Sequence, residues 1–430
     1  MVLPVPMLLL ATLVPQGETA NAAADAFRDP VDRLAHDGHY LAAIVELEGR
    51  LARQPADPGA VQQLATYQSF VGDEVAAART MARLGQPGRG SPPSAALSAA
   101  LEGSTPLPAL DEIARLAADR RVVILNEAHH VPRHRAFAHA LAERLRPLGF
   151  DYLACETFTA DCSALPTRGH ATRETGYYTV EPLFAEFVRA AVGLGFRPIH
   201  YEIEPVAGTT ATDMTDRINQ REIAQSEHLV ARIFERDPAA RVFIHCGWSH
   251  ATEDRSRTDD GREVAWMAAR LARRLGLDPL TIDQTEHTPA DGALSAVTAF
   301  ARHRGWLAQP LLLRRADGGA LVDGPAWAGR VDLQVLHPPT APRDGRPDWM
   351  HGAGGRSAAE IPPELEPEQG RRMVSAFRAE APPGALAVDR LVLEAGEPCP
   401  VLLLPPGRYR IEAEDESGRP TGSATIDHDG

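Results

Sequence analysis

Short apolar runs alternate with amphipathic segments through the middle of the chain, between about residues 111 and 283. The segments between the runs repeat apolar residues at helical spacing, and the first has Pro132 and Gly149 where helices begin and end. Fully apolar strands that alternate with helices are typical of a parallel sheet covered on both faces. The sequence therefore predicts an α/β core with the strands RVVILNE, FDYLACE, FRPIHYE, RVFIHCG and PLTIDQT.

The regions on either side of this core carry other patterns. Residues 26–88 are helical in pattern, and Gly38 and Gly72 lie one tetratricopeptide period of about 34 residues apart. Because the segment holds about one and a half repeats and a stable solenoid needs about three, a helical cap on the core is favoured over a peptide-binding groove. Towards the other end, apolar and polar residues alternate between turn signals, which predicts a small β-rich region.

Changes in composition divide the chain into six parts. One stretch rich in Gly, Pro, Ser and Ala precedes the core, and a Pro- and Gly-rich stretch that follows the core is expected to lie on the surface. The predicted parts are a signal peptide (1–25), a tetratricopeptide-like helical segment (26–88), a linker (89–108), the α/β core (109–345), a Pro- and Gly-rich segment (346–385) and a β-rich region (386–430).

The first 25 residues resemble a secretory signal peptide. An apolar stretch at residues 7–14 precedes the small residues Ala20, Ala22 and Ala23, which suit cleavage, although no basic residue comes before it. The stretch is too short to span a bilayer, and no other segment is long and apolar enough. We therefore expect a periplasmic or secreted protein, with a wrongly assigned start codon and a cytoplasmic protein as the alternative.

Composition narrows the classes of function. The chain has 430 residues, 44% of them hydrophobic, so it can bury a large core. Its net charge of −14 argues against nucleic acid and anionic membranes as partners. It contains no lysine, which excludes a lysine nucleophile. The four cysteines lack CxxC spacing, and Cys155 and Cys162 are either buried thiols or, in an exported protein, a disulfide.

Ionisable side chains gather where the predicted strands end. Ligands of open parallel sheets bind beyond the carboxyl ends of the strands, so these residues are expected to share one cleft. Any one of them, taken alone, is as readily explained as a helix cap or a paired surface group. The residues are Glu127, His129, His130, Glu156, His200, Glu202, Glu204, His245, His250, Asp283 and His287.

Such a cluster is costly to bury unless its members pair with each other, with arginine or with a metal. Neighbouring carboxylates raise one pKa, and histidine titrates near neutral pH, so the set can supply a general acid and a general base. Arg217 and Arg221 are one helical turn apart, and Arg221 is a candidate to neutralise the carboxylates or bind an oxyanion. The alternative is that both arginines pair with Asp213 or Glu222 on a solvated helix.

Two strand ends continue into a turn that leads to a histidine. NEAH ends in His129 and GWSH ends in His250, and Gly247 is expected to let the backbone turn sharply there. In these motifs, in Glu156 at the end of the second strand and in the helix INQREIAQSEHL, the chain resembles a known superfamily. This superfamily includes the erythromycin esterases, a haem-binding iron-regulated lipoprotein family and the Tiki-type metalloproteases. The resemblance covers about residues 105–290.

The chain departs from the superfamily pattern at one position. Asn126 stands where the superfamily usually has Gly in its first motif. Because Asn adopts the left-handed backbone more readily than most residues, the turn is expected to be retained.

The resemblance implies a hydrolase that acts on an ester, lactone or amide bond of a small molecule or peptide. His129 would act as general base on water, held by Glu127 or Glu156, and Arg221 and His250 would stabilise the oxyanion. No G-x-S-x-G motif indicates a serine nucleophile. The candidate catalytic residues are Glu127, His129, Glu156, Glu202, Arg221 and His250.

Three further hypotheses stay open. In a metal-dependent hydrolase, the ligands of Zn²⁺, Mn²⁺ or Co²⁺ would be His129, His250, Glu127 and Glu156. In an exported binding protein without turnover, haem would be bound through His130 or His134, which lie one helical turn apart. The N-terminal helices would, in the last hypothesis, bind a protein partner.

Overall fold

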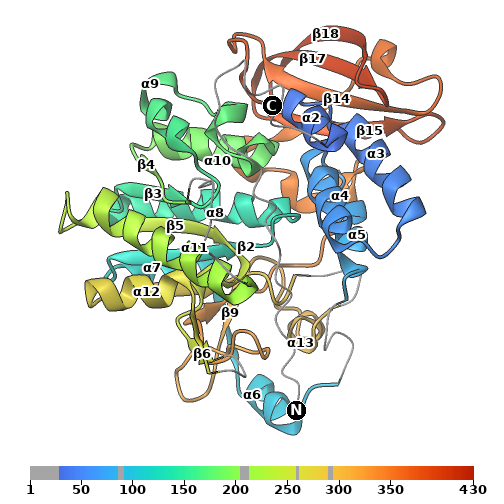
Figure 1. Cartoon of the computed structure of the whole chain (residues 1–430). Helices are drawn as coiled ribbons and strands as arrows, with labels where there is room; N and C mark the ends of the chain where they lie inside the picture. Colours follow the sequence, from blue (N-terminus) through green and yellow to red (C-terminus); the bar gives the residue numbers. More distant parts are fainter. Residues whose placement is uncertain (1–28, 86–91, 204–212, 258–260, 289–293) are drawn as a thin grey trace.

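The computed structural model describes residues 29–85, 92–203, 213–257, 261–288 and 294–430 (Figure 1). At its centre is a six-stranded sheet in the order β10-β8-β2-β5-β3-β4, in which every neighbouring pair is parallel. The predicted α/β fold class is confirmed, and the five predicted runs are the first five strands of this sheet along the chain. The strands are β2 (Val122–Glu127), β3 (Tyr152–Cys155), β4 (Arg197–His200), β5 (Val242–Gly247), β8 (Leu280–Asp283) and β10 (Leu333–Gln334).

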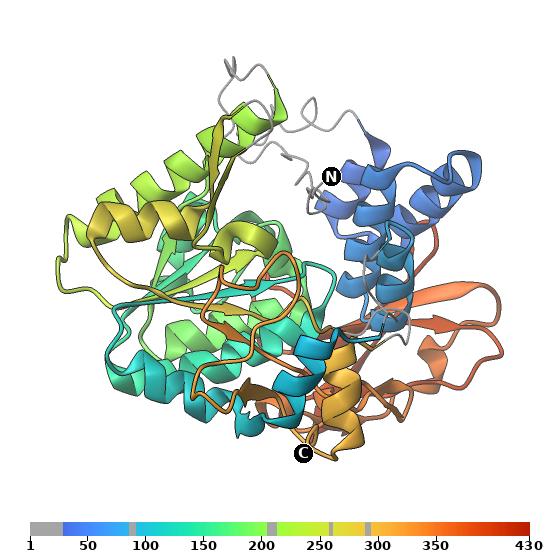
Figure 2. The same cartoon turned by 90° about the horizontal axis from the view of Figure 1, so that it is seen from below.

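Strand β2 shows why helices cover both faces of the sheet. Its side chains point alternately to the two faces, and all six of its residues are buried. Val123 and Leu125 pack into a core with α7, α8 and α10, whereas Val122 and Ile124 pack into a second core with α11, η5 and α12. Figure 2 shows the sheet between these two layers. The helices are α7 (Ala109–Ala117), α8 (Pro132–Leu145), α10 (Pro182–Gly193), α11 (Met214–Leu229), the π-helical η5 (Val230–Phe234) and α12 (Met267–Leu275).

The order of the strands changes direction between β2 and β5. After β2 the chain continues to β3 and β4 on one side, and after β5 it continues to β8 and β10 on the other. Such a switch point leaves a crevice between neighbouring carboxyl ends, where ligands of open α/β sheets bind. Glu127 at the end of β2 pairs in register with Gly247 at the end of β5, so the motifs NEAH and GWSH meet at this point.

The helices of residues 30–82 and the strands of residues 371–428 pack together as one accessory unit beside the core (Figure 1). Met373 and Val392 of its antiparallel sheet β15-β14-β17-β18 lie in the hydrophobic core of its helices. Arg371 of the sheet donates to the two carboxylate oxygens of Glu48 at 2.9 and 2.7 Å. The unit comprises α2 (Pro30–Asp37), α3 (Tyr40–Arg53), α4 (Pro58–Phe70), α5 (Glu74–Ala82), β14 (Arg371–Arg378), β15 (Asp389–Glu394), β17 (Gly407–Asp415) and β18 (Pro420–His428).

Two segments that were expected to be irregular contain regular structure. Residues 89–108, the expected linker, contain α6 (Ala95–Glu102) and β1 (Thr105–Pro108), because Ser94 caps an alanine- and leucine-rich run by accepting a hydrogen bond from Leu97 N at 3.1 Å. Residues 346–385, the expected surface segment, contain β14, which is paired on both sides by β15 and β17. These partners lie outside the segment itself, so its own composition does not indicate them.

The remaining described elements are short. Besides single 3₁₀ turns, they are four strand pairs and two helices: β9 (Leu311–Arg314) with β1, β6 (Arg255–Arg257) with β7 (Glu263–Ala265), β11 (Pro342–Arg343) with β12 (Arg346–Pro347), β13 (Ser357–Ala359) with β16 (Leu402–Leu404), α9 (Leu165–Arg168) and α13 (Ala296–His303).

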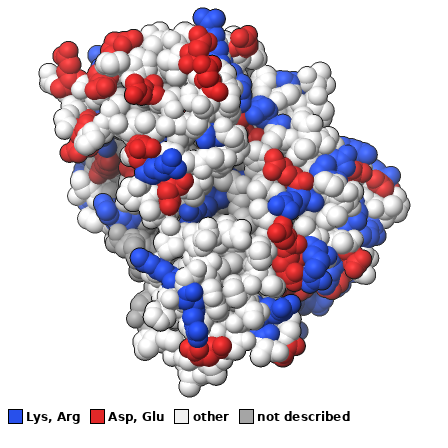
Figure 3. Space-filling model, turned by 180° about the vertical axis from the view of Figure 1, so that it is seen from behind, with Lys and Arg blue, Asp and Glu red and all other residues white. Residues whose placement is uncertain are grey.

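The structure addresses some of the predictions about the whole chain and leaves others untested. The predicted signal peptide lies outside the described residues. No helix in the described ranges is long and apolar enough to cross a bilayer. Cys155 and Cys162 are both buried free thiols. On the face seen in Figure 3, arginine and acidic side chains lie interspersed over the surface.

Candidate active site

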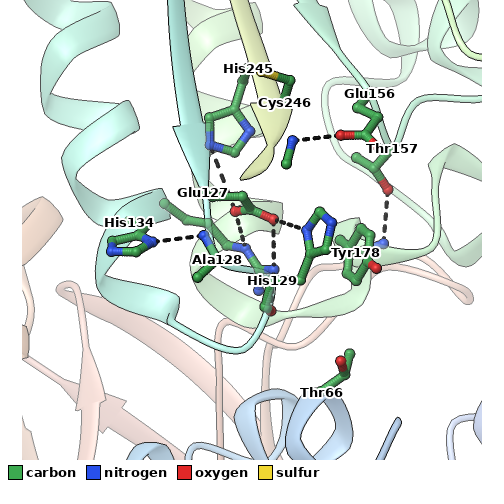
Figure 4. A network of polar contacts seen from close by, with 12 residues as sticks. Thr66, Glu127, Ala128, His129, His134, Glu156, Thr157, Tyr178, His245 and Cys246 are labelled. Atoms are coloured by element: carbon green, nitrogen blue, oxygen red, sulfur yellow. Dashed lines mark hydrogen bonds and ion pairs between the residues drawn. The ribbon is translucent and has the colours of Figure 1, made fainter. Parts of the chain in front are cut away.

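Glu127 and His129 form a buried pair at the carboxyl end of β2 (Figure 4). His129 Nδ1 donates to Glu127 Oε1 at 2.8 Å. Arg135, in the first turn of α8, donates to both Glu127 oxygens at 2.9 and 3.1 Å and to the His129 carbonyl oxygen at 2.8 Å. Since Nδ1 is bound to the carboxylate, the free edge of the imidazole presents Nε2.

The pKa of the Glu127 carboxyl is held well below its usual range. Burial raises it, but the charge of Arg135 and the hydrogen bond from His129 outweigh burial. His245 on β5 lies with its Nε2 3.7 Å from Glu127 Oε2, and burial lowers the pKa of His245 to about 4. At neutral pH this part of the site therefore contains an ionised Glu127, the Arg135 cation and a neutral His245.

Gly247 makes room for the His129 ring. A Cβ atom at position 247 would lie 2.5 Å from His129 Nε2 and 3.1 Å from Glu156 Oε2. The backbone of Gly247 is extended, with φ −84° and ψ 144°, and the residue with a positive φ is the next one, Trp248, at 43°. The expectation that Gly247 provides a sharp turn was therefore wrong: glycine is needed for close approach, and Trp248 makes the turn.

Arg221 of α11 lies between two carboxylates from neighbouring strand ends. It bonds Glu156, which follows β3, and Glu202, which follows β4, with its Nε 3.0 Å from Glu202 Oε2. Gly247 N donates to Glu156 Oε2 at 2.5 Å, and Gln225 Nε2 donates to Glu202 Oε2 at 3.0 Å. Burial raises the pKa of Glu156, yet the charges of His250 and Arg221 bring it well below its usual range.

His250 completes this charged cluster from the turn after β5. Its Nδ1 lies 2.9 Å from Glu222 Oε2 and its Nε2 lies 3.4 Å from Glu156 Oε1. Burial lowers the pKa of His250, but the Glu222 and Glu156 carboxylates raise it to about 10. His250 is therefore a cation at neutral pH, and its 3.1 Å contact with Arg221 Nη1 is an approach of two cations among three carboxylates.

The predicted catalytic residues thus lie together. The Glu127–His129 pair and the Arg221 cluster meet across the missing Cβ of Gly247, where His129 Nε2 and Glu156 Oε2 approach the same point. The six residues that the sequence singled out form this one set: Glu127, His129, Glu156, Glu202, Arg221 and His250.

The remaining strand ends do not share this set. Asp283 at the end of β8 accepts hydrogen bonds from Asn126 Nδ2 at 2.9 Å and Gln334 Nε2 at 3.0 Å, and His287 Nε2 lies 2.9 Å from Gln334 Oε1. His200 at the end of β4 has its Nδ1 3.9 Å from Cys162 Sγ. Neutral side chains thus bond Asp283 and His287, and these contacts do not join all five strand ends into the one cluster that the sequence predicted. Glu204 lies outside the described residues.

Asn126 joins the two halves of the sheet edge. It lies in the extended part of β2, and its Nδ2 donates to Trp248 O at 3.1 Å as well as to Asp283. Its Oδ1 accepts from Gln284 N at 2.9 Å. The expectation of a left-handed backbone here was wrong, because Trp248 and Asp344 are the described non-glycine residues with positive φ. Asn126 contributes through its amide instead.

The histidines considered for haem lie outside the catalytic set. His134 is fully buried, where its Nδ1 accepts from Ala128 N at 3.0 Å and its Nε2 lies 2.9 Å from Thr288 Oγ1. Both of its ring nitrogens are therefore engaged, which leaves none to bind iron. His130 is buried and stacks on Trp248, with ring centroids 6.1 Å apart. His134 is therefore not available as an axial ligand, and haem binding through His130 stays a prediction.

The metal-ligand set fits the geometry no better. Glu127 is neutralised by Arg135, and Arg221 lies among Glu156, Glu202 and His250, where a cation would have to bind. Within the described ranges no group of three or more His, Cys, Asp or Glu side chains is arranged to hold a metal ion. Guanidinium groups therefore supply the positive charge that the metal hypothesis assigned to Zn²⁺, Mn²⁺ or Co²⁺.

Three residues of the site were missed by reasoning from the sequence. Arg135 is fully buried and also contacts Glu181, with its Nη1 3.3 Å from Glu181 Oε2. The Tyr178 ring stacks on the His129 imidazole, with centroids 4.0 Å apart and planes 11° apart. The sequence did indicate that Arg135 is buried, because helical spacing places it on the same face of α8 as Ala138 and Ala142. Tyr178 lies in a single 3₁₀ turn and Glu181 caps α10, and nothing in the sequence around them indicated a role in the site.

Comparisons with known proteins leave the family open. No family model matches the chain, and no curated protein matches it significantly. Two solved structures that resemble it are one titled "Bacterial protein toxins" and RRSP, an effector domain of a MARTX toxin from Vibrio vulnificus. Both are 14% identical with a TM-score of 0.31, and they cover 56% and 52% of this chain. The chain spans less than half of each, 48% and 44%. At this similarity the matches carry no argument about activity.

Proposed function

We propose that the protein is a metal-independent hydrolase of an ester, lactone or amide bond. The observation that carries the proposal is the hydrogen-bonded Glu127–His129 pair, whose Nε2 edge faces Glu156 across Gly247. A carboxylate on Nδ1 fixes the tautomer of the imidazole and stabilises the imidazolium, which is the arrangement that a general base needs.

In the proposed reaction, His129 Nε2 takes a proton from a water molecule as the water oxygen attacks the carbonyl carbon of the substrate. Glu127 holds the imidazole and stabilises its positive charge. Arg221 and the cationic His250 stabilise the oxyanion that forms on the carbonyl oxygen. The tetrahedral intermediate then collapses, and the imidazolium returns the proton to the leaving oxygen or nitrogen.

The test is hydrolysis of a panel of aryl esters, lactones and peptide amides by wild type and His129→Gln, with a chelator present throughout. General-base catalysis contributes about 10²- to 10⁴-fold, so His129→Gln is expected to lower kcat/KM by that factor. The matched control is His139→Gln on α8, where the histidine lies 3.7 Å from Glu143 and outside the catalytic set. This control should retain the wild-type rate.

Loss of activity in chelator, restored by Zn²⁺, Mn²⁺ or Co²⁺, would overturn the metal-independent mechanism. If no substrate is turned over faster by wild type than by His129→Gln, the chain is not a hydrolase of this panel. The alternative is then an exported protein that binds a small ligand, which direct titration with haem or with the intact substrates would detect.

A further inference from the structure

An aromatic ring covers one face of the His129 imidazole. The Tyr178 ring stacks on it in nearly parallel planes, as described above. Tyr178 belongs to η4 (Tyr178–Val180), and its N–H donates to Thr157 Oγ1 at 2.8 Å. Gly176 lies against the same residue so closely that a Cβ would be 2.1 Å from Thr157 O. The backbone of Tyr178 is therefore anchored to Thr157, which follows Glu156 at the end of β3 (Figure 4).

The same segment is also anchored in the accessory unit. Tyr177 packs edge-on against Phe70 of α4, with centroids 6.0 Å apart, and its hydroxyl lies 3.3 Å from that of Tyr67. Val180 is buried in the hydrophobic core of the accessory helices. The Tyr178 ring thus lies between the Tyr177 ring, with centroids 4.9 Å apart, and the His129 imidazole.

A chain of buried charges links the end of this segment to the same pair. Glu181 accepts from Leu183 N and Phe184 N, both at 2.9 Å, and so caps α10. Its other contact is Arg135, which in turn holds Glu127. Burial raises the pKa of Glu181, and the Arg135 charge opposes that rise. Both members of the Glu127–His129 pair are therefore supported from residues 177–181.

We propose that residues 177–181 position the catalytic pair, with Tyr178 as the positioning residue for His129 and Tyr177 as its anchor to α4. This inference rests on the proposed hydrolase function. Nδ1 is held by Glu127, but that single hydrogen bond leaves the imidazole free to tilt. The stacked Tyr178 ring restricts the tilt of the imidazole, and the packing of Tyr177 on α4 fixes the position of that ring.

The first arm of the test is kinetic. Tyr178→Leu removes the stacked ring, and Tyr178→Phe retains it. A misplacement of about 1 Å can cost roughly 10²-fold in rate, so Tyr178→Leu is expected to lower kcat about 10- to 100-fold with KM unchanged. Tyr178→Phe, which keeps the ring, is expected to have the kcat of wild type. Tyr177→Leu should lower kcat less, because it loosens the anchor and leaves the ring.

The matched control is Tyr409→Phe. It removes the hydrogen bond of a buried accessory-unit tyrosine, from Tyr409 Oη to Pro405 O at 2.7 Å, at a site outside the segment. It is expected to leave kcat unchanged. If Tyr178→Leu does not fold, Tyr178→Met, which also lacks a ring, takes its place.

The second arm does not depend on turnover. In protein labelled with ¹³C at the histidine ring carbons, the His129 signal is assigned from its loss in His129→Gln. Ring current from a stacked tyrosine shifts that signal upfield in wild type and Tyr178→Phe, and the shift should vanish in Tyr178→Leu. If the shift behaves in this way and no substrate is hydrolysed, the proposed function fails and the positioning stands. Wild-type kcat or an unchanged His129 signal in folded Tyr178→Leu would overturn the inference.

Discussion

Two groups of buried ionisable residues lie along the carboxyl edge of the six-stranded sheet, and we call them the charged half and the neutral half. Both contain carboxylates and histidines, but the carboxylates have different partners. Around Glu127, Glu156 and His250, carboxylates are balanced by the cations of Arg135 and Arg221. Around Asp283, the carboxylate accepts hydrogen bonds from neutral amides, a hydroxyl and backbone N–H groups. Both halves are buried at the carboxyl ends of parallel strands.

The difference shows that a polar residue at a strand end is a weak indicator of a catalytic role. Asp283 and His287 have their hydrogen bonds provided by Asn126, Gln334 and Ser295, so they serve to join β2, β8 and β10. His129 keeps its Nε2 edge towards Gly247. A network of charged pairs with one reactive edge left over is the better indicator of chemistry, and neutral networks that close on themselves indicate structure.

The largest expected difference between the halves concerns stability. Arg135→Met would leave Glu127 and Glu181 buried without their cation, so we expect a loss of about 3–5 kcal/mol in the free energy of unfolding. In the neutral half, Gln284→Met would leave uncharged polar groups without a hydrogen bond. The free energy of unfolding should therefore fall by about 1–3 kcal/mol. Urea unfolding followed by circular dichroism measures both. Equal losses would mean that charge does not distinguish the two halves.

The second prediction concerns pH. Because the folded-state pKa of His250 is about 10, above its usual value of 6.5, its stabilisation is complete below pH 6.5 and is lost as pH rises towards 10. Burial holds the pKa of His337, in the neutral half, well below 6.5, so His337 destabilises the fold as pH falls below 6.5.

The test is the free energy of unfolding measured between pH 4.5 and 9.5. His250→Gln should flatten the alkaline decline in stability, and His337→Gln should flatten the acidic decline. Parallel pH curves for the two variants, or flattening on the same side, would contradict the assignment of a charged half and a neutral half.

The smallest expected effect is a coupling energy. Asn126→Ala and Gln334→Ala remove two side-chain amides that donate to the same carboxylate, Asp283, from Nδ2 at 2.9 Å and from Nε2 at 3.0 Å. Their double mutant should deviate from additivity by about 0.5–3 kcal/mol. Asn126→Ala combined with His129→Gln shares no described hydrogen bond and should be additive within about 0.5 kcal/mol. Strong coupling in the second pair would show that the two halves act as one.

Much of the core and of the candidate site could be predicted from local sequence. Buried parallel strands are continuous apolar runs, so each run was visible, and the ionisable residues that follow them are brought together by parallel pairing itself. Glu127, His129, Glu156, Arg221 and His250 come together for this reason. Their catalytic roles stay predictions.

What could not be predicted depends on contacts between distant parts of the chain. Tyr178 meets His129 because Tyr177 is anchored to Phe70 of α4, and a single sequence shows no such pairing. The partner strands of β14 likewise lie outside its own segment. Gly247 was identified correctly as necessary but for the wrong reason, since a strand end where a ring needs space and one where the backbone turns look alike in sequence.

The accessory unit also sets the order of events while the chain is being made. Its helices are synthesised before the α/β core, but Met373 and Val392, which contribute to their hydrophobic core, are added only after it. Because synthesis proceeds at roughly 5–20 residues per second, the apolar face of the helices stays uncovered for tens of seconds. Until β14 and β15 are synthesised, this uncovered apolar surface is a place where newborn chains can associate with one another.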